Sequence, residues 1–207
     1  MSEAAVRVRA GRRFLACLGV GAAWMAATPA LADDVATLVA TVCNACHMPD
    51  GNSVVPMFPK LAGQQAEYLE KQLADYITGK RPNDVMAPVI AQIKPGDIKG
   101  LAAFYAGQKP APGTVNDAAL AEAGRKLYED GNEESGVPAC VGCHQPAGEG
   151  NPRYPRLAGQ HQAYTSLEMQ DFKTGVRAND KGKVMRAVAD RMTEAEIYAV
   201  AEYLAGL

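Results

Sequence analysis

Hydrophobic and polar positions follow the period of an α-helix in several stretches of this 207-residue chain. Between residues 65 and 78, apolar and aromatic side chains recur every three or four positions, which places them on one face of a helix. That face consists of Tyr68, Leu69, Leu73, Tyr76 and Ile77, and the charged residues expected to point away from it are Glu67, Lys71 and Asp75. Residues 161–174 repeat the pattern, so we predict a helix in both stretches.

A further helix is predicted at the C-terminal end of the chain. Thr193 and Glu196 have the spacing of a capping box, in which each side chain bonds a free backbone amide at the start of a helix. The apolar face that follows consists of Ile197, Val200, Ala201 and Leu204. Gly206 suits the end of this helix, and Pro95 suits the first turn of a matching helix earlier in the chain. Because no useful length of sequence alternates with a period of two, we predict an all-α fold.

An internal repeat divides the chain into two halves. The sequence CNACH at 43–47 recurs as CVGCH at 140–144, and PKLAGQ at 59–64 recurs as PRLAGQ at 155–160. The repeated segments keep the same order and nearly the same spacing. We therefore interpret the chain as a duplicated domain.

The segment between the two copies sets the domain boundary. Residues 108–116 are rich in proline and glycine, which cannot continue a helix, and we assign them as a linker. The predicted domains are residues 33–110 and 111–207. Each is small enough that its hydrophobic core alone would be marginal, so a bound group is expected to complete it.

Residues 1–32 have the pattern of a cleaved signal peptide. Four arginines precede an apolar run at 14–27, and the small residues at 30–32 suit a cleavage site. The apolar run is shorter than the ~20 residues that a membrane-spanning helix needs. We therefore predict export to the periplasm, and Cys17 is expected to be lost with the signal peptide.

The charge balance excludes one class of partner. The chain has 21 Lys and Arg against 23 Asp and Glu, a formal net charge of −2, which lacks the basic excess of a nucleic-acid-binding protein. Most of the acidic excess lies in the second half. This bias is expected to influence which partner surfaces dock there.

The two Cys-x-x-Cys-His sequences carry the candidate chemistry. Two cysteines three residues apart can form thioether bonds to the two vinyl groups of a haem, and the adjacent histidine can then bind the iron. The predicted attachment residues are Cys43, Cys46, Cys140 and Cys143, and the predicted iron ligands beside them are His47 and His144. Two such motifs at equivalent positions predict two covalently bound haem c groups.

Other uses of these residues explain less of the pattern. Two local disulfides would leave both repeated histidines without a role. A zinc site would need a fourth repeated ligand at a usual spacing, and a thioredoxin-like dithiol would need a βαβ unit. Neither feature is found in this sequence.

A second axial ligand is expected on each iron, and a methionine thioether raises the reduction potential. Met86 and Met185 are the methionines that the repeat places at equivalent positions, so we predict that they bind the two irons. Met192 corresponds to Ile93, which indicates a core position. It is the most plausible replacement if Met185 is not a ligand.

Two features near the histidines have open interpretations. The carbonyls of Pro59 and Pro155 could accept a hydrogen bond from the second ring nitrogen of His47 and His144 and so orient each ring. The alternative is that each proline only shapes a turn.

His161 corresponds to a glutamine in the first half, so we predict a surface histidine and not a ligand.

These motifs resemble the dihaem cytochrome c4 family over essentially the whole mature chain. The resemblance includes both haem-attachment motifs, the two repeated proline-to-glutamine segments, and Met86 and Met185. It implies two tandem cytochrome c domains related by a pseudo-twofold, with the haems facing one another across the domain interface. It also implies a periplasmic electron carrier, loosely associated with the membrane, that serves terminal oxidases.

The expected function is electron transfer between redox proteins, without enzymatic activity. Two alternatives stay open: the dihaem subunit of a flavoprotein dehydrogenase of the flavocytochrome c sulfide dehydrogenase type, and a dihaem peroxidase or thiosulfate dehydrogenase-type enzyme. The enzymes need a haem whose distal ligand is absent, exchangeable or not methionine. Here a methionine is present in each half at the expected position.

Overall fold

A computed structural model describes residues 30–207, and within them the protein is helical. The first half contains α1 (Ala30–Leu38), a π-helical turn (Val39–Cys43), α2 (Asn44–His47), α3 (Ala66–Ile77), α4 (Ala87–Ile90), a 3-10 turn (Pro95–Asp97) and α5 (Ile98–Ala106). The second half contains α6 (Ala118–Asp130), α7 (Val141–His144), α8 (Gln162–Thr174), a 3-10 turn (Lys181–Lys183), α9 (Val184–Arg191) and α10 (Glu194–Gly206). In this part of the chain, β-type pairing is limited to two isolated bridges, so the predicted all-α fold is confirmed.

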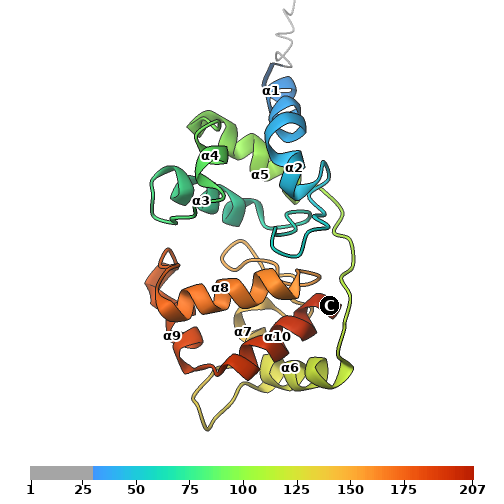
Figure 1. Cartoon of the computed structure of the whole chain (residues 1–207), viewed down its shortest axis with the longest axis vertical. Helices are drawn as coiled ribbons and strands as arrows, with labels where there is room; N and C mark the ends of the chain where they lie inside the picture. Colours follow the sequence, from blue (N-terminus) through green and yellow to red (C-terminus); the bar gives the residue numbers. More distant parts are fainter. Residues whose placement is uncertain (1–29) are drawn as a thin grey trace, which may run out of the picture.

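The two halves lie one above the other along the long axis of the molecule (Figure 1). Helix α3 of the first half and helix α8 of the second half lie at the junction between them. The segment between α5 and α6 runs along one side of the molecule and joins the halves. This arrangement brings the repeated segments of the two halves face to face.

Each half has its own hydrophobic core. Buried residues of the first core include Val39, Leu69, Ile93, Leu101 and Tyr105, and those of the second include Leu127, Tyr128, Met192, Ile197, Val200 and Leu204. The first and last helices of each half cross at a glycine. A Cβ on Gly100 would lie 2.4 Å from the Val35 side chain, and a Cβ on Gly124 would lie 1.9 Å from the Ala199 carbonyl oxygen. Only glycine permits these close approaches, which set how α1 packs on α5 and α6 on α10.

Most of the predicted helices are confirmed. The stretches 65–78 and 161–174 form α3 and α8, and the capping box at the start of α10 is present. The helix predicted to start near Pro95 begins with a 3-10 turn and continues as α5. Helices α1 and α6, which start the two halves, were not predicted.

One side of α3 differs from the prediction. Asp75 was expected to point away from the packed face, but it is only 8% exposed. Its carboxylate accepts a hydrogen bond from Nδ2 of Asn179 at 2.7 Å and pairs with Lys71. Asp75 is therefore covered by the second half of the protein, which a helical pattern within one half does not reveal, whereas Glu67 and Lys71 are exposed as predicted.

The N-terminal prediction falls largely outside this structure. Residues 1–29 of the predicted signal peptide are not among the described residues, and residues 30–32 belong to α1. From residue 30 onward, the helices are too short or too polar to cross a membrane. The domain boundary near residue 110 lies between α5 and α6, and it stays a prediction.

Candidate haem centres

Each Cys-x-x-Cys-His sequence forms one short helical turn. In the first half, Cys43 precedes α2, which contains Cys46 and His47. The equivalent residues in the second half are Cys140, Cys143 and His144 of α7. Both histidines are buried, and the residue after each, Met48 and Gln145, has a positive φ that turns the chain away from the helix. The local fold thus presents two sulfur atoms and one imidazole from a single turn in each half.

Both histidine rings are oriented by a backbone carbonyl. Nδ1 of His47 lies 2.9 Å from the carbonyl oxygen of Pro59, and Nδ1 of His144 lies 3.0 Å from that of Pro155. Because a carbonyl can only accept, Nδ1 carries the proton and Nε2 keeps a lone pair for a metal. Burial lowers the pKa of both imidazoles, although the carbonyl bond acts in the opposite direction. Of the two interpretations left open for these prolines, the contacts support the one in which each carbonyl orients a histidine ring.

These donor sets fit a covalently attached haem. The four cysteines between residues 30 and 207 are free thiols and are not paired as disulfides. In the same part of the chain, no cluster of three or more His, Cys, Asp or Glu side chains is arranged to hold a bare metal ion. Two thiols and one neutral imidazole per turn are the groups that haem attachment needs. The disulfide and zinc alternatives are thus not supported.

The two candidate methionines occupy equivalent turns. Met86 is the residue directly before α4, and Met185 lies in the first turn of α9. Both are half-buried, and Met86 packs against the core of the first half. Met192 is fully buried in the second core, as its correspondence with Ile93 predicts. The ligand roles of Met86 and Met185 stay a prediction.

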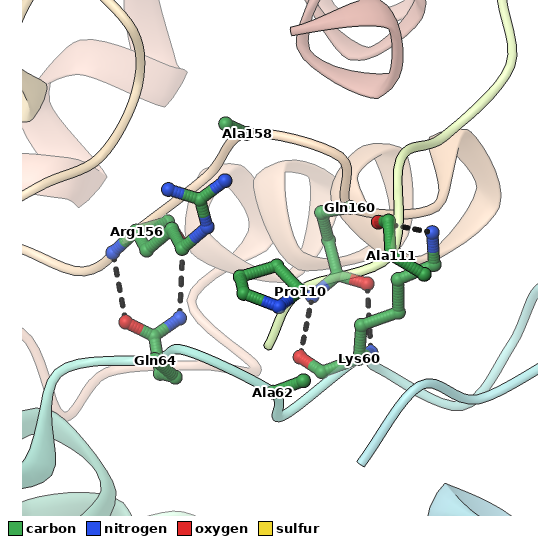
Figure 2. A pocket seen from close by; sticks show the side chains of 8 residues that line it. All are labelled: Lys60, Ala62, Gln64, Pro110, Ala111, Arg156, Ala158 and Gln160. Atoms are coloured by element: carbon green, nitrogen blue, oxygen red, sulfur yellow. Dashed lines mark hydrogen bonds between the residues drawn. The ribbon is translucent and has the colours of Figure 1, made fainter. Parts of the chain in front are cut away.

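Two glutamines join the halves beside the histidine-orienting prolines (Figure 2). Nε2 of Gln64 donates to the Arg156 carbonyl at 2.9 Å, and Oε1 of Gln64 accepts from the Arg156 amide at 2.8 Å. Gln160 makes the same two bonds to Lys60, at 3.0 and 2.9 Å. The four residues line a small cavity at the interface together with residues of the linker. The interface is therefore pseudo-twofold symmetric at this point.

A buried charged cluster lies between α3 and α8. The guanidinium of Arg81 stacks on the ring of Tyr76 and donates to the hydroxyl of Tyr164 at 3.1 Å. Arg177 stacks on Phe172 and donates to the hydroxyl of Tyr68 at 2.9 Å. Each arginine thus packs against its own half and bonds the other. Both also donate to Oε1 of Gln72, at 2.9 and 3.2 Å respectively.

A single glutamate balances these two arginines. The carboxylate of Glu168 forms ion pairs with both Arg81 and Arg177. Burial tends to raise the pKa of Glu168, but the charges of Arg177 and Arg81 outweigh it and hold the pKa below its ordinary value. Glu168 is therefore ionised at neutral pH. In the first half, Gln72 occupies the equivalent position.

The surface position predicted for His161 is wrong. It is half-buried at the interface, where its Nε2 donates to the Ser53 carbonyl at 2.9 Å. The equivalent residue, Gln65, makes the corresponding bond from its Nε2 to the Glu149 carbonyl at 2.9 Å. A glutamine amide and a histidine ring can both place an N–H at this distance, which explains why the two positions differ in sequence.

The interface residues were missed by the sequence analysis, although a signal existed. Arg81 and Arg177 belong to repeated segments at 78–84 and 174–180, and Gln64 and Gln160 end the repeated PKLAGQ and PRLAGQ segments. Repetition indicated that these residues have equivalent tasks. It did not indicate that each residue acts on the opposite half.

Comparisons with known proteins agree with this geometry. The cytochrome c family matches the chain twice, at residues 32–107 and 121–207. Cytochrome c4 of Thiocapsa roseopersicina is 47% identical over 169 residues, covering 80% of this chain and 87% of that protein. A crystal structure of reduced recombinant cytochrome c4 from Pseudomonas stutzeri has a TM-score of 0.80 at 40% identity, covering 85% of this chain and 98% of the other. A thiosulfate dehydrogenase electron acceptor of Thiomonas intermedia is 36% identical over 198 residues, covering 94% of this chain and 90% of that protein.

Two haem-attachment turns in two cytochrome c domains define a dihaem c-type cytochrome, a class of electron carrier. The chain belongs to the cytochrome c4 family within that class. It therefore carries two covalently bound haem c groups and exchanges electrons with other redox proteins.

Proposed function

We propose that each half holds a six-coordinate haem, with His47 and Met86 as axial ligands in the first half and His144 and Met185 in the second. Thioether bonds to Cys43 and Cys46, and to Cys140 and Cys143, would attach the two haems. The observation that carries this proposal is the pair of buried imidazoles, each beside two cysteines and held through Nδ1 by a carbonyl. The equivalent positions of Met86 and Met185 support the distal assignment.

This ligand set leaves no position on either iron for a substrate. The haem supplies a metal that gains or loses one electron, and the chain supplies a fixed environment around it. The carbonyls of Pro59 and Pro155 fix the planes of the two buried imidazoles. Such a site exchanges electrons without bond making or breaking, which supports a carrier and not an enzyme.

We further propose that the protein works in the periplasm, peripherally associated with the membrane, and passes electrons from respiratory complexes to a membrane-bound terminal oxidase. The signal-peptide pattern of residues 1–32 supports export. The similarity to cytochrome c4 proteins over most of the chain supports a respiratory role. The acidic excess of the second half would bias which partner docks on which half.

A second candidate function is to accept electrons from a thiosulfate dehydrogenase. The similarity to the Thiomonas intermedia protein, which extends over nearly the whole chain, favours it. This candidate needs the same two haems and differs only in the electron donor. The flavoprotein-subunit alternative has no comparable observation in its favour.

Substitution of the methionines tests the ligand assignment. In Met86→Ala or Met185→Ala, we expect the reduction potential of one haem to fall, because the thioether that favours ferrous iron is lost. Each variant should also lose its share of the far-red sulfur-to-iron absorption band of the ferric protein. Retention of the full band in both variants would assign the distal ligands to other residues.

Rapid mixing tests the choice of partner. The reduced protein is mixed with membranes that contain a terminal oxidase, and the oxidised protein is mixed with thiosulfate and a thiosulfate dehydrogenase. The respiratory proposal predicts fast oxidation in the first experiment and slow reduction in the second. Fast reduction in the second experiment would favour the second candidate function, whatever the rate of oxidation in the first.

A further inference from the structure

Each haem-binding histidine is connected to the opposite half of the protein through one peptide unit. In the first half this is the peptide that joins Pro59 to Lys60. Its carbonyl oxygen accepts from Nδ1 of His47 at 2.9 Å. Its N–H, which belongs to Lys60, donates to Oε1 of Gln160 in the second half at 2.9 Å.

The second half contains the same connection in the reverse direction. The carbonyl oxygen of the Pro155–Arg156 peptide accepts from Nδ1 of His144 at 3.0 Å. Its N–H donates to Oε1 of Gln64 at 2.8 Å. Gln64 therefore belongs to the first half but contacts the peptide that orients the histidine of the second half.

The orientation of each glutamine amide is set by its surroundings. Gln64 and Gln160 are only 8% and 9% exposed, so their polar atoms need partners within the protein. In each amide, Nε2 donates to the next carbonyl of the opposite half, which leaves Oε1 facing the peptide N–H. Figure 2 shows the two pairs of bonds. A flipped amide would place donor against donor and acceptor against acceptor.

A peptide group that donates through its N–H becomes a better acceptor at its carbonyl oxygen, because the two bonds polarise the same amide. A stronger acceptor at Nδ1 makes the imidazole more electron-rich and a stronger ligand. Electron donation to the iron favours the ferric state and lowers the reduction potential.

We propose that Gln160 and Gln64 are positioning residues that lower the reduction potential of the haem in the opposite half. Gln160 acts on the first haem through the Pro59–Lys60 peptide, and Gln64 acts on the second haem through the Pro155–Arg156 peptide. The halves are thereby coupled through hydrogen bonds as well as through contact. This inference rests on the proposed function, in which His47 and His144 bind the two irons.

The test is a redox titration of the intact dihaem protein followed by proton NMR, in which the shifted haem methyl signals report each haem separately. In Gln160→Met, a side chain of similar length without hydrogen-bonding groups, the potential of the first haem should shift to a more positive value. The second haem should keep its potential. Gln64→Met should give the reverse result.

Two neighbouring residues serve as matched controls. His161→Ala and Gln65→Ala each remove one hydrogen bond across the same interface, to the carbonyls of Ser53 and Glu149, without contacting either connecting peptide. We expect both potentials to stay at the wild-type values in these variants. Gln160→Glu, which keeps an oxygen acceptor for the Lys60 amide, should not raise the potential of the first haem.

The inference is overturned if Gln160→Met and Gln64→Met change neither potential, change both equally, or change only the haem in the substituted half. It is also overturned if His161→Ala causes the same shift as Gln160→Met. Failure of the proposed function would be distinct, because the ferric wild-type protein would then lack the strongly shifted signals of two iron-bound histidines.

Discussion

The two halves of the protein are alike where each proximal histidine is held and differ at the turns that carry the candidate methionines. Both histidines bond a proline carbonyl, and both prolines precede a residue held by a glutamine of the other half. Around Met86 and Met185, by contrast, the contacts are of different kinds. The shared features make both halves haem-binding domains, and the differing ones give each haem its own surroundings.

The methionine turn of the first half is held by a neutral hydrogen bond. Oδ1 of Asn83 accepts from the backbone amide of Met86 at 2.9 Å. In the second half, the buried carboxylate of Asp180 accepts from the backbone amide of Arg186 at 3.1 Å and from its Nε at 2.6 Å. Hydrogen bonds to charged groups are about twice as strong as neutral ones. The turn of Met185 is therefore held more tightly than that of Met86.

The C-terminal end of α9, the helix that contains Met185, also has support that the first half lacks. The ammonium of Lys173 donates to the carbonyls of Ala189, Asp190 and Met192, at 3.2, 2.9 and 2.7 Å, where α9 ends. The equivalent residue in the first half is Ile77, which cannot donate. The longer helix of the second half, α9 against α4, agrees with this additional support.

Removal of one haem should give the largest difference between the halves. In the combined variant Cys43→Ser, Cys46→Ser and His47→Ala, we expect the first half to unfold largely and the second to persist, because each small core needs its haem. Far-ultraviolet circular dichroism should then lose the contribution of α1 to α5. The matching variant at Cys140, Cys143 and His144 should spare the first half instead. An unchanged spectrum would contradict the prediction.

Removal of the interface carboxylate should have the next largest effect. Glu168→Gln leaves two buried guanidiniums without a counter-charge, which is expected to cost about 3 kcal/mol of unfolding free energy. Denaturant titration measures this loss. The control is Glu122→Gln, since the Glu122 side chain is 51% exposed against 12% for Glu168 and its solvent-screened ion pair with Arg125 should contribute much less. Equal losses in the two variants would contradict the assigned role.

The contribution of Glu168 should depend on pH in a defined direction. Its pKa is lower in the folded protein than in the unfolded chain, so its stabilising effect is fully present above the unfolded pKa of about 4.5. It is lost as the pH falls through the folded value. The difference in unfolding free energy between wild type and Glu168→Gln should therefore be constant near neutral pH and shrink below about pH 4.5. If the difference in unfolding free energy between wild type and Glu168→Gln grew on acidification, the assigned direction of the pKa shift of Glu168 would be contradicted.

The smallest expected effect concerns the turn of Met185. Asp180→Ala removes a charged hydrogen-bond acceptor, so imidazole should displace Met185 from ferric iron at a concentration about tenfold lower than in wild type. The imidazole concentration at which the sulfur-to-iron band is half lost measures this displacement. Asp84→Ala, at the exposed equivalent position, should leave the titration unchanged. Equal effects of the two substitutions would remove the proposed distinction between the turns.

Local features of the fold and site could be predicted from the sequence. The periodicity of α3 and α8, the capping box of Thr193 and the pairing of each histidine with a proline carbonyl depend on residues near one another in the chain. Repetition added the equivalence of the two haem-attachment turns. The two helices and the capping box are confirmed, and the proline carbonyl contact is the one observed of two interpretations left open, because short-range geometry determines these features.

Features that depend on the opposite half could not be predicted in this way. Asp75 has the position of a solvent-facing residue on α3, and the histidine at position 161 is not repeated in the first half. Contacts with the other half nevertheless cover both residues. Gln64 and Gln160 were visible as repeated residues, but their partners are about 90 to 100 positions away. Helix α6 was missed although its N-cap, Asp117, and its amphipathic pattern are local signals, and α1 was missed because it begins within the residues assigned to the signal peptide.

Mass spectrometry of the purified protein shows whether both halves carry a haem, since thioether-bound haem stays attached when the polypeptide is denatured. We expect the added mass of two haem groups, one on the peptide that contains Cys43 and Cys46 and one on the peptide that contains Cys140 and Cys143. A polypeptide without added haem mass, or with a single haem, would contradict this expectation.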